Sequence, residues 1–248
     1  MEFDKLKMYF GEPLDINDPD GHTIRVLQPT IGDIIEIGEE KFYQTLNIFI
    51  ANTTMYRATL WDSGIDWNDI SDFDLFILLY RMIDKDISDL LFEDIDFSKF
   101  QVNQTTGETP EIVLRDPESG IVINKDGYMV MHKYLQEVFN LKPEDEYTKD
   151  AMLKKWWVEK DKREAERKAK KKDDKQFSIQ PLISSMVNHP GFKHGLKDLK
   201  SVGVCEFYDS IQRLQVYESS TALLKGLYSG MIDGSKIKAE EYNWMKQL

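Results

Sequence analysis

Residues 34–49, IIEIGEEKFYQTLNIF, decide the fold class of this chain. Phe42, Leu46 and Phe49 recur at intervals of four and three residues, the spacing that places apolar side chains on one face of an α-helix. The acidic residues before them favour the start of a long helical region. A helical core is therefore the first prediction.

Three further stretches on the amino-terminal side predict helices. Residues 75–83 carry apolar side chains at the same spacing, and Ser71 is placed to cap the helix that holds them. Residues 54–61 predict a shorter helix. Another helix resumes at about Gly127 and has ended by Pro143, whose backbone has no N–H to donate.

Two β-hairpins interrupt the helical pattern. Residues 7–16 lead into the turn-forming run of residues 17–21, NDPDG, and residues 22–28 lead out of it. The apolar segments 112–114 and 121–123 flank a second turn. We therefore expect a mainly α protein with small antiparallel β-hairpins, an α+β fold.

Charge is divided unevenly along the 248 residues. Residues 1–150 hold 13 Lys and Arg against 31 Asp and Glu, a net charge of −18, whereas residues 151–248 hold 19 against 13, a net charge of +6. We predict three parts: an acidic amino-terminal module to residue 150, a charged helix or linker over residues 151–176, and a helical module over residues 177–248.

The central part is the most charged. Residues 154–175 contain eleven basic and six acidic side chains, and almost no apolar ones after Val158. As a helix this stretch would be roughly 33 Å long at about 1.5 Å per residue. We expect an exposed rod or a linker that does not pack into a core along its length.

Helical spacing returns in the last part. Ile179 and Met186 belong to one apolar face, and residues 204–214 form a longer one. Residues 221–229 add three leucines, and a final short helix is expected to end at Leu248.

The single cysteine, Cys205, cannot form an internal disulfide, which favours a reducing compartment. The first ten residues lack the apolar centre of a signal peptide, so we expect no export by that route. The longest apolar runs are far shorter than the roughly 20 residues that span a bilayer, so no membrane contact is expected.

The candidate catalytic and metal-binding residues do not have the spacing that such sites need. His189 and His194 flank a predicted loop without a cysteine or acidic cluster beside them, and Cys205 has no neighbouring histidine. Residues 62–74 hold five aspartates, but Ile70 and Ser71 occupy positions where a calcium loop needs a ligand and a glycine. We therefore predict helix caps and solvated carboxylates, no catalytic residue, no metal site and no cofactor. The chain is not expected to be an enzyme.

Two other motifs have simpler interpretations than a ligand site. Residues 15–21 resemble a calcium loop, but Pro19 stands where a ligand should be, and a hairpin turn explains the composition. The basic run Lys168–Lys172 could neutralise phosphates. Interspersed acids and the lack of aromatics between Trp157 and Phe177 favour a charged exposed helix over a nucleic-acid site.

Large aromatic and apolar side chains in the second half of the chain are candidates for partner binding, since such residues anchor many protein interfaces. Packing inside the core is the alternative interpretation for the same residues. The candidate partner-binding residues are Trp156, Trp157, Phe207, Tyr208, Ile211, Leu214, Leu224, Leu227, Tyr228 and Trp244.

Several of these residues lie in stretches that resemble a known family. Residues 207–215 (FYDSIQRLQ), 223–233 (LLKGLYSGMID) and 242–245 (YNWM) resemble the endings of tail assembly proteins of tailed bacteriophages. Residues 25–33 (RVLQPTIGD), which follow a hairpin and precede helices, are similar to the opening of baseplate and tail assembly proteins.

The resemblance implies a non-enzymatic, chaperone-like protein in the host cytoplasm. Its partners would be tail, tape-measure or baseplate proteins, and self-association through the same surfaces is a further option. A structural subunit of the baseplate or connector, retained in the virion, is the first alternative. Nucleic-acid binding through the basic helix is the second.

Overall fold

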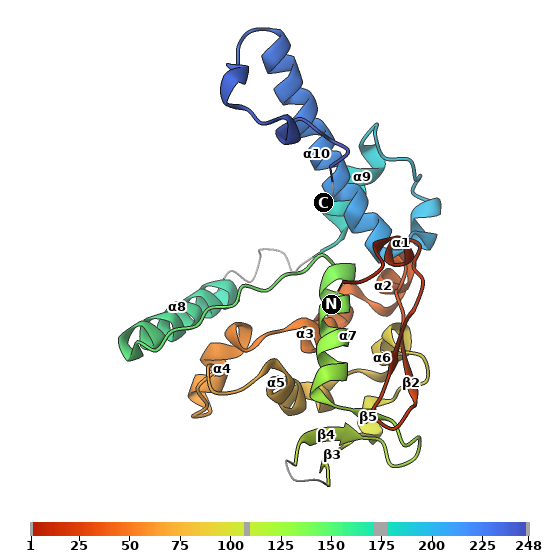
Figure 1. Ribbon diagram of the computed structural model, residues 1–248, viewed down its shortest axis with the longest axis vertical. Helices are drawn as coiled ribbons and strands as arrows, with labels where there is room; N and C mark the ends of the chain where they lie inside the picture. The colour runs from red at the N-terminus through yellow and green to blue at the C-terminus, as the bar shows by residue number, and fades with distance from the viewer. Residues whose placement is uncertain (1, 107–109, 171–177, 247–248) are drawn as a thin grey trace.

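The computed structural model describes residues 2–106, 110–170 and 178–246 (Figure 1). These residues form a mainly α structure with one two-stranded and one three-stranded antiparallel sheet, which confirms the predicted fold class. The α-helices are α1 Lys5–Tyr9, α2 Ile31–Ile37, α3 Glu39–Ile50, α4 Arg57–Asp62, α5 Asp72–Leu79, α6 Lys85–Leu91, α7 Lys125–Val138, α8 Ala151–Lys170, α9 Gln180–Asn188 and α10 Val204–Tyr228. The strands are β1 Leu14–Asn17, β2 Thr23–Val26, β3 Gln101–Gln104, β4 Ile112–Arg115 and β5 Val122–Ile123.

The first hairpin forms between β1 and β2, with Leu14 opposite Val26. Its turn is built on Asp18, whose carboxylate accepts hydrogen bonds from the backbone N–H of Asp20 at 2.9 Å and of His22 at 2.7 Å. The expectation of a strand from residue 7 is wrong, because Asp4 caps α1 there.

The second hairpin is confirmed between β4 and β5, where Leu114 lies opposite Ile123. The turn-forming composition of residues 103–107 (NQTTG) predicts a loop, but the structure places residues 103 and 104 in β3, on the outer side of β4. All four residues of β3 are exposed, so the strand has no alternation of buried and exposed positions. Residue 107 of the expected loop lies outside the described residues.

Polar caps set where the early helices begin. The hydroxyl of Thr30 accepts a hydrogen bond from the Asp33 N–H at 3.2 Å, and the Asp33 carboxylate accepts one from the Thr30 N–H at 2.8 Å. This capping box starts α2 at Ile31, three residues before the stretch 34–49 from which the helical region is predicted. The predicted cap at Ser71 is confirmed, with Asp74 as its reciprocal partner.

The main core lies between α3, α5 and α7 and is rich in phenylalanine. The ring of Phe49 contacts those of Phe76, Phe92 and Phe97, with centroids 5.0–5.7 Å apart. The same core takes in residues from the last third of the chain, including Ile179, Met186, Val202, Val204 and Phe207.

Backbone hydrogen bonds join the last third to the start of α2. The N–H of Ile31 donates to the Val202 carbonyl at 3.0 Å, and the N–H of Val204 donates to the Pro29 carbonyl at 3.1 Å. Gly32 allows this approach, because a Cβ there would lie 2.5 Å from the Lys200 carbonyl oxygen. The entry to α10 is thereby fixed to the amino-terminal part.

The charged segment is helical, as expected, but it does not stand free along its length. The first half of α8 packs against α4, with Val158 buried in a second, smaller core that contains Leu60 and Trp67. The expectation that the segment avoids a core is therefore wrong for its first half. Residues 171–175 of that segment lie outside the described residues.

A single 25-residue helix, α10, replaces the two apolar stretches expected over residues 204–229. Its second half leads away from the rest of the molecule (Figure 1). The expectation of a final helix is wrong for residues 242–246, which follow two short 3-10 turns and are not helical. Leu248 lies outside the described residues.

Candidate interaction surfaces

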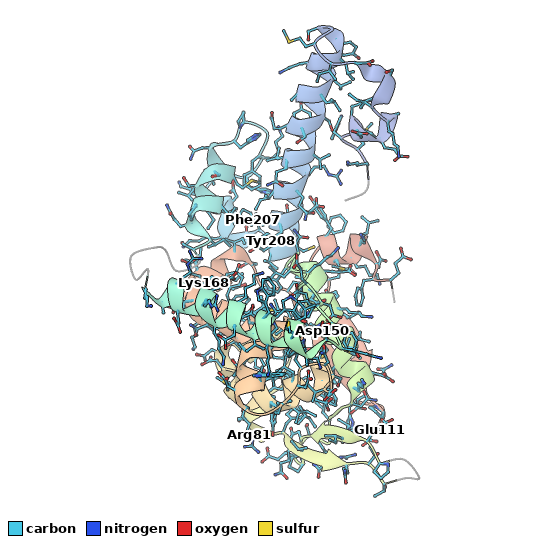
Figure 2. The ribbon with its side chains drawn as sticks, turned by 90° about the vertical axis from the view of Figure 1, so that its left-hand side faces the viewer. Arg81, Glu111, Asp150, Lys168, Phe207 and Tyr208 are labelled. Atoms are coloured by element: carbon cyan, nitrogen blue, oxygen red, sulfur yellow. The ribbon has the colours of Figure 1, made fainter. Side chains whose placement is uncertain are left out.

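The carboxy-terminal arm, defined as residues 215–246, is the first candidate surface. The first half of α10, which leads into the arm, is fixed to the body. Phe207 is fully buried, and the hydroxyl of Tyr208 lies 2.8 Å from the hydroxyl of Tyr43 on α3. Figure 2 shows both side chains where α10 meets the body. Ile211 and Leu214 are half-buried and pack against the main core. The helix is therefore anchored before it projects.

A tight return brings the chain back along α10. Gly230, with a φ of 72°, follows the end of the helix, and the N–H of Met231 donates to the Gly226 carbonyl at 3.1 Å. The Arg213 guanidinium then donates to the Trp244 carbonyl at 3.0 Å and to the Lys246 carbonyl at 2.7 Å. These bonds hold the end of the chain beside α10.

The arm exposes large apolar side chains. Tyr228 is 87% exposed, Met231 86% and Met245 71%. Tyr217 and Trp244 are each 43% exposed and pack edge to face, with ring centroids 5.6 Å apart. Exposed apolar side chains gathered on one segment are typical of a protein-binding surface.

The predicted partner-binding residues on α10 and the arm differ in exposure. Tyr228 and Trp244 lie exposed on the arm, and Leu224 and Leu227 are half-buried there. Phe207 belongs to the core and does not form part of an accessible surface. The structure adds Met231 and Met245 to the exposed residues of the arm. Sequence composition did not identify them, although Met231 follows Gly230 and Met245 follows Trp244.

Helix α8 is the second candidate surface, and its inner side is occupied. Trp157 is half-buried, with its ring 6.4 Å from that of Trp67 and 5.2 Å from the guanidinium carbon of Arg57. Lys154 pairs with Asp66, and Lys162 pairs with Asp62. The adjacent Trp156 points the other way and is 58% exposed.

Arg57 is the centre of the α8 contact and is only 4% exposed. It pairs with Asp161 of α8 and with Glu146 in the segment that precedes α8. Burial alone would lower the pKa of Arg57, but the hydrogen bonds to the two carboxylates outweigh burial and raise it. The guanidinium therefore stays charged inside the contact.

His189 and His194 lie beside carboxylates, and Cys205 is half-buried. His194 Nε2 lies 2.9 Å from a Glu206 carboxylate oxygen, and His189 Nε2 lies 3.6 Å from one of Glu218. Burial, with Asp209 and Glu137 nearby, raises the pKa of Cys205 to about 11, so the thiol is protonated at neutral pH. Within the described residues, no three His, Cys, Asp or Glu side chains are grouped so that they could hold a metal ion.

Four of the five aspartates in residues 62–74 have structural partners. Asp62 and Asp66 pair with lysines of α8, Asp72 accepts a hydrogen bond from the Thr53 N–H at 2.9 Å, and Asp74 caps α5. In the basic run Lys168–Lys172, Lys171 and Lys172 lie outside the described residues, and Lys168 is exposed. None of the helices in the described part of the chain is long and apolar enough to cross a membrane.

The comparison with protein families gives one finding for the arm. Residues 169–248 match the YomV second domain, and YomV is a protein of a Bacillus prophage. The match covers α9, α10 and the whole arm, just under a third of the chain. It associates this part of the chain with phages and prophages. No curated protein and no solved structure matches the chain.

Proposed function

We propose that this chain is a non-enzymatic assembly protein of a phage tail or baseplate, which uses its carboxy-terminal arm to bind apolar segments of another tail component. The tape-measure protein is the leading candidate partner. Binding would keep that component soluble in the host cytoplasm until it is incorporated.

The exposed apolar surface of the arm carries this proposal. Tyr228 and Met231 lie at its tip, where their side chains are almost fully accessible. Methionine adapts to irregular apolar partners because its side chain is unbranched and flexible. An apolar helix of a client protein is a suitable partner, since it could cover these side chains and lose its own exposed surface at once.

The anchoring of α10 supports a binding role. The base of the helix is tied to α2 by backbone hydrogen bonds and to α3 through Tyr208. A surface on a fixed element loses less conformational freedom on binding than one on a free tail. The acidic body, with its net charge of −18 over residues 1–150, would help keep a complex with an apolar client in solution.

Co-expression tests the proposal. The tagged chain would be produced together with the structural proteins encoded by neighbouring genes, and captured partners would be identified by mass spectrometry. We expect a tail or baseplate protein to be captured and to become more soluble. Replacing Tyr228, Met231 and Met245 by serine should abolish both effects.

A matched control lies on the body. Leu78 and Met82 are 55% and 70% exposed, so replacing them by serine removes exposed apolar side chains away from the arm and should leave capture intact. If the neighbouring tail proteins behave identically with and without the chain, the proposal fails.

Analysis of purified particles separates an assembly factor from a virion subunit. An assembly factor is expected to be absent from mature particles, or present far below the amount of the tail proteins. Stoichiometric presence in the baseplate or connector would instead identify a structural subunit.

A further inference from the structure

Helix α8 has an outer face with a regular pattern that its packing on α4 does not use. Trp156, Lys160, Arg163 and Arg167 follow one another at intervals of four, three and four residues, so they share the side of the helix opposite Val158. All four are exposed. This stripe is called the α8 outer face below.

The α8 outer face is cationic and aromatic. The Lys160 ammonium lies 5.9 Å from the centre of the Trp156 ring. Within the part of the chain that the structure describes, no carboxylate lies within ion-pair distance of Lys160, Arg163 or Arg167, whereas the inward lysines of α8 are both paired. The exposed indole and three cations together fit a partner that offers an apolar floor and carboxylates.

The chain itself contains a surface of that chemistry. A groove of 700 Å³ lies between the first hairpin and the start of α7. Glu2, Asp4, Asp15, Asp18 and Asp126 line it, together with apolar side chains such as Phe3 and Val130. Asp15 pairs with Arg25, Asp4 caps α1 and Asp18 holds the hairpin turn, so Glu2 and Asp126 are the carboxylates of the groove without such a partner among the described residues. None of the described residues that line this acidic groove is basic.

The two surfaces lie on opposite sides of the molecule. In Figure 1, α8 projects on one side and the β1–β2 hairpin lies on the other. In Figure 2, α8 crosses the front of the molecule, between the labelled Asp150 and Lys168. One chain cannot bring its own α8 outer face to its own acidic groove.

We propose that the α8 outer face of one copy docks in the acidic groove of a second copy. Trp156 would cover the apolar floor, and Lys160, Arg163 and Arg167 would face the carboxylates at the rim. Because the two surfaces differ, the contact is heterologous and joins copies head to tail. The stripe holds a single aromatic side chain, Trp156, which disfavours single-stranded nucleic acid as the occupant, because successive bases need several stacking partners.

Sedimentation velocity of the full chain tests the docking. At low salt we expect the average mass to rise with protein concentration. At about 1 M salt, where the screening length falls to about 3 Å, we expect the monomer. Trp156→Ala should weaken association at low salt, because it removes the apolar part of the contact.

Charge reversal provides the decisive comparison. The variant Arg163→Glu/Arg167→Glu makes the helix face acidic, and the variant Glu2→Lys/Asp126→Lys makes the groove basic. Each variant alone should associate on the order of tenfold or more weakly, because like charges then meet at the contact. Mixed in equal amounts, the two variants should associate again, since each reversed surface finds a complement on the other chain.

The substituted side chains are exposed, so each variant should keep the circular dichroism spectrum of the parent chain. A parent chain that is monomeric at every concentration in low salt would overturn the proposal. A mixture of the two folded variants that stays monomeric would also overturn it. So would a parent chain that retards DNA through its α8 residues, if reversing the charge of those residues leaves self-association unchanged.

Discussion

Arg57 on α4 holds Asp161 on α8 through two hydrogen bonds, although the two residues are 104 positions apart in the chain. The bond from Nη2 to Oδ1 is 2.7 Å long, and Glu146 accepts a third hydrogen bond from the same guanidinium. This buried cation connects the acidic amino-terminal part to α8, for which sequence composition predicts an exposed rod or linker.

Replacing Asp161 by alanine should therefore loosen α8. The guanidinium would lose one of its two carboxylates while remaining buried, and we expect the free energy of unfolding to fall by about 2 kcal/mol. Denaturant titration measures the change, and hydrogen exchange should show faster exchange along α8. Glu166→Ala removes an exposed carboxylate of the same helix and should change stability by less than about 0.5 kcal/mol.

Gly32→Ala should disturb the junction between α2 and the segment before α10. The added Cβ would lie 2.5 Å from the Lys200 carbonyl oxygen, so backbone has to shift, and we expect a loss of about 1–3 kcal/mol. Gly203→Ala is the matched control in the same junction, because no atom lies within 4 Å of a Cβ there and its φ of −64° suits alanine. Equal stability of the two variants would contradict this account.

Asp18 should make stability fall in acid. Burial raises the pKa of its carboxyl, but hydrogen bonds from the Val122 N–H, the His22 N–H and the His22 ring outweigh burial and lower the pKa below its usual value. The stabilisation is complete above the unfolded-state pKa of about 3.9, and it is lost as the pH falls through the lower folded-state pKa.

Unfolding midpoints at several pH values between 7 and 3 measure this contribution. The stability difference between the parent chain and Asp18→Asn should shrink as the pH falls below about 4, because asparagine does not titrate. Asp69→Asn, at an exposed position, should track the parent chain throughout.

Cys205 should react slowly with alkylating reagents. With a thiol pKa of about 11, little thiolate forms at pH 8.5, where an unfolded chain with a thiol pKa of about 8.5 is half ionised. We expect alkylation of the folded chain to be on the order of 100-fold slower than in denaturant, as followed by mass spectrometry. Similar alkylation rates in the two states would show that the thiol is not buried and that its pKa is not raised.

Periodicity and caps were enough to predict the elements whose signals are local. The spacing of Phe42, Leu46 and Phe49 gives α3, and the cap at Ser71 with Asp74 gives the start of α5. Both hairpin turns are marked by runs of Asp, Pro and Gly. The α6 helix was missed because it is only seven residues long, although Asp84 caps it and Ile87, Leu90 and Leu91 stand at helical spacing.

The features that could not be predicted from the sequence depend on contacts between residues far apart in the chain. Docking of α8 rests on Arg57 and Trp67, roughly a hundred residues before the residues they meet, and Val158 is the one buried residue of that helix. The accessible surface of the arm could be predicted only in part. Aromatic composition identified Tyr228 and Trp244, but it could not distinguish them from Phe207, which is buried by residues from the amino-terminal part.

The pairing of Thr30 with Gly203 sets an order of events during synthesis. Residues near Thr30 leave the ribosome many seconds before Gly203 does, at synthesis rates of about 5–20 residues per second. The body can therefore begin to fold while the arm has not yet been made, and α10 has a site to dock on as soon as it emerges. Exposure of the apolar tip is thus delayed until the part of the protein that keeps it in solution is in place.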